Sequence, residues 1–133
     1  MRQFVGMGIG ILVGTGLGAA AVTGLHAQAK PPVYLVTEIT VNNPEAYGKE
    51  YSPKAQASIK AHGGKLIALG GAGGGGSQGI KGLEGQPPQR AAIQLWESME
   101  KLEAWRNSPE YQEARKIGDK YATFRAYAVE GRQ

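Results

Sequence analysis

Two side chains could serve as general acid–base groups, and they are His62 and Glu38. An imidazole titrates near neutral pH, and a carboxylate can accept a proton once its surroundings raise its pKa. Each also has a structural interpretation. His62 precedes Gly63 at a predicted helix end, where a cation is favourable, and Glu38 can face solvent on a strand. We keep both as candidate catalytic residues, although no serine nucleophile elbow and no telling acid pair accompanies them.

Arginine and aromatic side chains are candidates for binding a small ligand. A guanidinium can hold an acidic group through two parallel hydrogen bonds, and aromatic rings can roof a pocket. The predicted ligand-binding residues are Arg90, Trp105, Tyr111 and Arg115. The alternatives are core packing for the rings and salt bridges for the arginines, Arg125 included, with Glu38, Glu84 or Glu97 as partners.

Neither a metal nor a cofactor is expected. The chain has no cysteine, and His62 is the only histidine after residue 30, so a closed zinc site is not expected. The glycine-rich loop over residues 70–85 contains Gly71-x-Gly73-x-x-Gly76, which matches the dinucleotide fingerprint literally. A second strand follows this loop where the fingerprint requires a helix, so we interpret it as a hairpin loop.

The charge pattern argues against nucleic acid as a partner. The net charge is +4, and acidic and basic residues are mixed along the chain after residue 30. A nucleic-acid-binding protein usually carries a stripe of basic residues, whereas mixed charge is typical of solvated helix faces.

Residues 1–29 predict an export signal. Arg2 precedes an uncharged run from Gln3 to Ala29, and Ala27-x-Ala29 is the small-residue pattern that signal peptidases cleave. Cleavage would leave a periplasmic or secreted domain over residues 30–133. The alternative is an uncleaved membrane anchor, because the run is long enough to span a bilayer and carries glycines four residues apart. In both cases we expect the domain to lie outside the cytoplasm.

The rest of the chain predicts an α+β fold. Alternating or β-branched runs predict strands over residues 33–41, 65–69, 89–96 and 120–130. Capping signals at Asn43, Ser98 and Ser108 start helices. Pro53 predicts a kink or two short helices in the first helical stretch, and Gly118 is expected to end the last helix. The order βαββαβ is that of a ferredoxin-like domain, with one antiparallel sheet and the helices on one face. The other sheet face carries apolar residues, so we expect a homodimer that covers it.

Several segments resemble a known family. They are YLVTEITVNNPEAYGKEY, AHGGKLIALGG, RAAIQLWESMEKLEAWRNSPEYQEAR and YAVEG. Together they resemble the domain of unknown function 1330, which is similar to YCII-like and other dimeric α/β-barrel proteins. The resemblance implies the fold and assigns no activity. The export segment and the enlarged glycine loop depart from the family pattern.

Three hypotheses for function follow. The first is a homodimeric small-ligand-binding protein. Its pocket lies between the sheet and the helices or at the dimer seam and is lined by Arg90, Glu38, His62 and Trp105. The second is a cofactor-independent isomerase, cyclase or monooxygenase that uses His62 or Glu38 as a base, with an arginine or tyrosine stabilising the oxyanion. The third is a structural or assembly role.

Overall fold

The computed structural model describes residues 30–71 and 79–132. Residues Pro31–Gln133 form one compact unit, which is the domain considered below. The predicted export signal over residues 1–29 lies outside the described residues, as does most of the glycine fingerprint. Within the described ranges, no helix is both long and apolar enough to cross a membrane.

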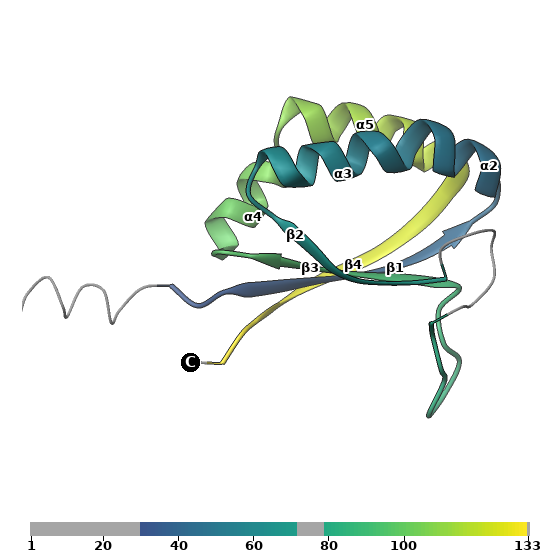
Figure 1. The fold of residues 1–133 in the computed structure, drawn as a ribbon, viewed down its shortest axis with the longest axis horizontal. Coiled ribbons are helices and arrows are strands. Elements are labelled where there is room, and N and C mark those ends of the chain that lie inside the picture. Colours follow the sequence, from purple (N-terminus) through teal and green to yellow (C-terminus); the bar gives the residue numbers. More distant parts are fainter. Residues whose placement is uncertain (1–29, 72–78, 133) are drawn as a thin grey trace, which may run out of the picture. The chain divides into compact units, whose positions relative to one another are not determined.

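Four antiparallel strands form one sheet, in the spatial order β2-β3-β1-β4. The strands are β1 (Val33–Val41), β2 (Lys65–Gly70), β3 (Arg90–Trp96) and β4 (Ala122–Glu130). The helical elements all lie over one face of the sheet, with α3 and α5 side by side (Figure 1). They are α2 (Pro44–Ala46), η1 (Tyr47–Tyr51), α3 (Ser52–Ala61), α4 (Met99–Arg106) and α5 (Pro109–Tyr121). The predicted ferredoxin-like order of elements is therefore confirmed.

The first helical segment is divided just before Pro53 into η1 and α3, in line with the predicted two short helices, although the backbone stays helical across the junction. Ser52 has helical dihedral angles, φ −52° and ψ −47°, and its N–H donates to the carbonyl of Tyr47, five residues earlier. A proline ring clashes with the carbonyl four residues before it, and a widened π-turn shifts that carbonyl. Pro53 then occupies the first turn of α3, where it needs no N–H donor.

Gly118 does not end the last helix, contrary to the sequence prediction. Helix α5 continues to Tyr121, and β4 starts at Ala122 rather than at Lys120. A Cβ atom at Gly118 would lie 2.6 Å from the ring of Tyr51. The glycine thus permits close packing of α5 against η1, which is a tertiary reason for glycine rather than a helix stop.

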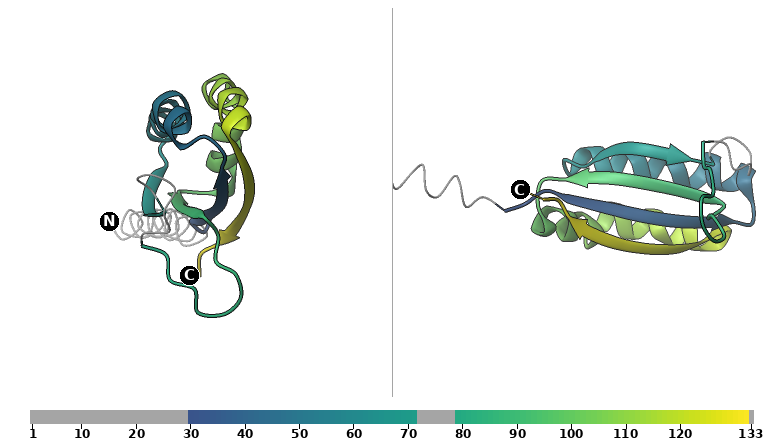
Figure 2. Two further views of the ribbon diagram at one scale, coloured as in Figure 1. Left: turned by 90° about the vertical axis from the view of Figure 1, so that its right-hand side faces the viewer. Right: turned by 90° about the horizontal axis from the view of Figure 1, so that it is seen from below.

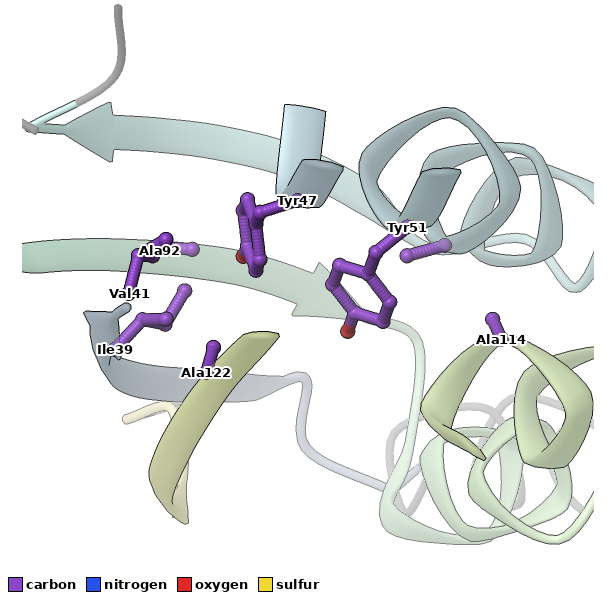
Figure 3. Close-up of a cluster of buried hydrophobic side chains, with 8 residues drawn as sticks. Ile39, Val41, Tyr47, Tyr51, Ala92, Ala114 and Ala122 are labelled. Carbon is purple, nitrogen blue, oxygen red and sulfur yellow. The ribbon is translucent and has the colours of Figure 1, made fainter. Parts of the chain in front are cut away.

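The buried side chains form two clusters between the sheet and the helices. One cluster gathers around Tyr47 and Tyr51, whose rings project from the helical segment toward the sheet (Figure 3). The other gathers around Trp96 and Trp105, whose ring centroids are 5.1 Å apart. Both clusters lie on the covered face of the sheet.

The opposite face of the sheet carries no helix in the described structure (Figure 2, right). Strand alternation places a largely apolar set of side chains there: Tyr34, Val36, Ile93, Leu95, Tyr127 and Val129. Tyr34, Tyr127 and Val129 are among the exposed large hydrophobic residues of the domain. We call this side of the sheet the uncovered face and these six residues its apolar set.

Candidate functional site

A cavity of about 240 Å³ lies on the covered face, where the two buried clusters meet. Its floor is formed by inward-facing residues of three strands: Leu35, Thr37 and Ile39 of β1, Arg90, Ala92 and Gln94 of β3, and Phe124 and Ala126 of β4. These positions alternate along each strand, so the two-residue period of the sheet sets the floor.

Aromatic rings form much of the remaining wall. Tyr47 and Tyr51 have ring centroids 5.0 Å apart, and Trp105 and Tyr111 have centroids 4.1 Å apart. The indole N–H of Trp105 donates to the hydroxyl of Ser58 at 2.9 Å, which fixes the orientation of the ring. The wall is thus both apolar and held in place by packing and hydrogen bonding.

Most of the exposed residues of the cavity lining lie on β2 and on η1 and α3, and they mark its opening. On the strand side, Leu66 and Leu69 line it and are 37% and 47% exposed; on the helix side, Gln56 lines it and is exposed. The pairing of β2 with β3 shifts register between Leu66 and Ala68. This bulge places both leucines opposite inward-facing residues of β3, so both reach the opening.

Arg90 is the buried cation of the cavity. The residue is 8% exposed, and its Nε atom is buried without a hydrogen-bond partner. Its Cζ atom lies 5.1 Å from the centroid of the Tyr47 ring. Among the described residues no carboxylate forms an ion pair with it.

Arg115, which also lines the cavity, has partners for its charge. Its Nε donates to Asp119 Oδ1 at 2.8 Å, and one terminal nitrogen donates to the Tyr111 hydroxyl at 3.2 Å. Its guanidinium lies 4.1 Å from the centroid of Phe124. Arg90 and Arg115 therefore differ, because the charge of Arg115 is compensated within the chain and that of Arg90 is not.

Two of the tyrosines that line the cavity, Tyr47 and Tyr51, are protonated phenols rather than bases. Burial, reinforced by the neighbouring Tyr111 and Tyr47, raises the pKa of Tyr51 far above its usual value. Burial also raises the pKa of Tyr47, although the nearby Arg90 acts in the opposite direction. Both phenols remain protonated at neutral pH.

The four predicted ligand-binding residues Arg90, Trp105, Tyr111 and Arg115 all line this cavity. Glu38 and His62, which were expected in a pocket either here or at the dimer seam, do not line this cavity. Strand alternation puts Glu38 on the uncovered face, where its carboxylate lies 3.1 Å from Arg125 and accepts from the Tyr127 hydroxyl at 3.4 Å. The predicted salt bridge between Arg125 and Glu38 is thus confirmed.

His62 lies at the far end of α3, away from the cavity lining. Its Nε2 is 3.5 Å from the carboxylate of Glu110, at the start of α5. With Glu38 and His62 placed elsewhere, no aspartate, glutamate or histidine of the described chain lines the cavity. The described residues also contain no group of three potential metal ligands.

Sequence reasoning missed Tyr47, Tyr51 and Gln94 as cavity residues. The two tyrosines recur at helical spacing, which also fits core packing, and they do both here. Gln94 was a usable signal, because it is a polar residue on the inward face of β3, in line with Arg90 and Ala92. Its Oε1 accepts from the indole N–H of Trp96 at 2.9 Å.

Solved structures confirm the fold. A protein of unknown function from Rhodopseudomonas palustris is similar, with a TM-score of 0.57 and 16% identity over 86% of this chain and 93% of its own. A variant of SnoaB, a cofactor-independent oxygenase from Streptomyces nogalater, has a TM-score of 0.55 and 14% identity over 77% and 95%. A protein from Bacteroides fragilis, described as dimeric with a ferredoxin-like fold, has a TM-score of 0.52 and 10% identity over 77% and 99%. At these identities the likeness concerns the fold alone.

No curated protein matches the chain. The family model described as domain of unknown function 1330 matches residues 32–132, which is almost all of the domain described above. The resemblance inferred from the sequence segments is thus confirmed, and the chain belongs to the DUF1330 family.

Proposed function

We propose that this protein is a homodimeric small-ligand-binding protein that works outside the cytoplasm, and that its ligand occupies the cavity between sheet and helices. The observation that carries this proposal is the cavity itself, which joins ordered aromatic walls to a buried arginine. Ligand sites are typically concave, mostly apolar and equipped with a few convergent polar groups.

The cavity volume limits the size of the ligand. At about 240 Å³ the cavity is larger than the roughly 150 Å³ apolar cavity that accommodates benzene in another protein. It is smaller than the pockets of about 300–1,000 Å³ that hold drug-sized molecules. A single substituted ring, or a chain of similar volume, fits best.

The uncovered face supports the homodimer. Its apolar set extends over three adjacent strands, and water contact with such a surface is unfavourable. A second copy placed across a two-fold axis would cover the same residues on both subunits. The Bacteroides fragilis neighbour, which shares the fold, is described as dimeric.

The location outside the cytoplasm rests on the sequence of residues 1–29. The small-residue pattern before Lys30 supports cleavage after Ala29. Amino-terminal sequencing of protein from fractionated cells tests this. We expect mature protein to begin at Lys30 in the periplasm or medium; protein that begins at Met1 in the membrane fraction would support the anchor instead.

A second candidate is a cofactor-independent enzyme acting in the same cavity. SnoaB, which shares the fold, is a cofactor-independent oxygenase, and this favours the second candidate. Arg90 and the protonated tyrosines could stabilise an oxyanion there. The cavity lining offers no carboxylate or imidazole base, however, so the binding role is the better supported of the two.

Native mass spectrometry of the protein purified from its own compartment tests the proposal. We expect a dimer mass together with a small molecule that is lost on denaturation. Consistently monomeric protein would contradict the dimer. Protein without bound ligand that also fails to bind any member of a library of small aromatic compounds would contradict the binding function.

A further inference from the structure

We propose that the cavity selects a small planar monocarboxylate, in which an aromatic or conjugated body lies against the ring walls and the carboxylate pairs with Arg90. This inference rests on the proposed binding function, because it specifies the ligand class of the same site. It goes beyond that function by assigning the charge, the shape and the anchoring residue.

Arg90 carries a buried positive charge that has no counter-charge within the described chain. An arginine side chain stays protonated at all physiological pH values, so its charge cannot be removed on burial. Arg90 is 8% exposed, its Nε lacks any acceptor, and its guanidinium lies over the face of the Tyr47 ring. An uncompensated buried charge is unfavourable, and a ligand carboxylate can relieve it through two parallel hydrogen bonds.

The side chains that line the cavity carry an excess of positive charge. Three arginines line the cavity, namely Arg90, Arg106 and Arg115, and the described lining holds no acidic residue. Asp119 neutralises Arg115 from outside, and Arg106 is partly exposed. Arg90 is therefore the one buried cation of the lining that lacks a counter-charge, which matches a ligand with a single negative charge.

Polar groups that line the cavity with Arg90 include hydrogen-bond donors. Gln94 lines the cavity and uses its Oε1 atom to accept from Trp96, which leaves its NH₂ group as a donor. The buried hydroxyls of Tyr47 and Tyr51 keep their protons. Donors near Arg90 suit a carboxylate, which accepts hydrogen bonds and donates none.

The aromatic walls of the cavity favour a flat shape for the apolar part of the ligand. The rings of Tyr47, Trp105, Tyr111 and Phe124 surround the space, and the exposed Leu66 and Leu69 line its opening. Planar rings gain from contact with aromatic side chains in tilted or offset arrangements. A flat apolar body with one carboxylate therefore matches both the walls and the buried guanidinium.

Calorimetric titration with matched ligand pairs tests this proposal. The protein is isolated from cells that express the full chain, and the pairs are benzoate with benzamide and 2-naphthoate with 2-naphthamide. In the wild type, we expect at least one carboxylate to bind about tenfold or more tightly than its amide, as a charge-assisted hydrogen bond implies. The Arg90→Met variant should lose this preference while it still binds the amide at least as well.

The Arg125→Met variant is the matched control, since it removes an arginine from the uncovered face. It should keep the wild-type preference for the carboxylate. The Arg90→Lys variant keeps the charge but not the planar fork, so it should retain only part of the preference for the carboxylate. If Arg90→Met fails to fold, the reduced preference of Arg90→Lys is the test.

The outcomes separate this inference from the function on which it rests. Equal binding of acid and amide, or a preference that survives Arg90→Met, would overturn the carboxylate assignment and leave a ligand-binding cavity. If neither acids nor amides bind at millimolar concentration, both this inference and the proposed binding site are contradicted.

Discussion

Each face of the sheet carries an arginine, and the two arginines differ in burial and in ion pairing. On the covered face, Arg90 is buried beside Tyr47 and has no carboxylate partner among the described residues. On the uncovered face, the Arg125 side chain is 74% exposed and pairs with Glu38 at 3.1 Å. The covered face also has aromatic walls that are held by packing, whereas the uncovered face carries exposed apolar side chains.

This difference shows which arginine is informative about function. An exposed ion pair contributes about 0–1 kcal/mol and is a common surface feature. A buried guanidinium without a counter-charge is costly, and it therefore points to a partner that the chain itself does not provide. We infer ligand chemistry from the covered face and assembly from the uncovered face.

The largest effect is expected from removing a wall of the covered face. Trp105→Ala deletes an indole that is 1% exposed, and it leaves Ser58 without its hydrogen-bond donor. Such truncations cost about 3–5 kcal/mol of unfolding free energy. Chemical denaturation measures this loss, and a loss below about 1 kcal/mol would show that the wall is not an ordered part of the domain.

The next effect concerns the uncovered face. Ile93→Lys places a charge within the apolar set, between Val36 and Ala68. If this face is the dimer seam, burying the charge weakens association by at least about 2 kcal/mol, or roughly thirtyfold. Light scattering across a dilution series measures it. Thr40→Lys, near the end of β1 and outside the apolar set, should leave the dimer intact.

A smaller effect is expected where α5 approaches η1. In Gly118→Ala the new Cβ would lie 2.6 Å from the Tyr51 ring, which has to move within the cavity wall. Overpacking of this kind costs about 1–3 kcal/mol. Gly48→Ala is the control, because a Cβ there meets nothing within 4 Å. Equal thermal stability of the two variants would contradict the close packing.

The two arginines allow a direct comparison of stability without ligand. Arg90→Met removes a buried, unpaired charge, so the unfolding free energy should stay the same or rise by about 1–2 kcal/mol. Arg125→Met removes an exposed pair and should lower it by about 0–1 kcal/mol. Ligand-free denaturation curves measure both. A large loss in Arg90→Met would mean that Arg90 already has a partner within the protein.

The smallest expected effect is that of pH on binding. Arginine remains charged, and burial raises the pKa of Tyr47 and Tyr51 away from neutrality. The dissociation constant of a carboxylate with a pKa near 4 should therefore be constant between pH 6 and 9. Calorimetry over this range tests it, and a step near pH 6–7 would reveal a titrating group at the site.

The element order and the four predicted ligand-binding residues followed from local signals. Strand alternation puts Arg90 inward, and helical spacing puts Trp105, Tyr111 and Arg115 on faces that meet the sheet. Gly118 could not be interpreted from sequence, because a helix stop and a close packing contact call for the same residue. Glu38 and His62 were grouped with the pocket by chemical type, whereas alternation and helix length place them elsewhere.

The most direct test of the account is a crystal structure of the protein with 4-iodobenzoate, whose iodine is located by anomalous scattering. The account predicts iodine density between the sheet and the helices, with the carboxylate within about 3 Å of the Arg90 guanidinium. Iodine bound at the uncovered face, or in the cavity with its carboxylate directed away from Arg90, would contradict it.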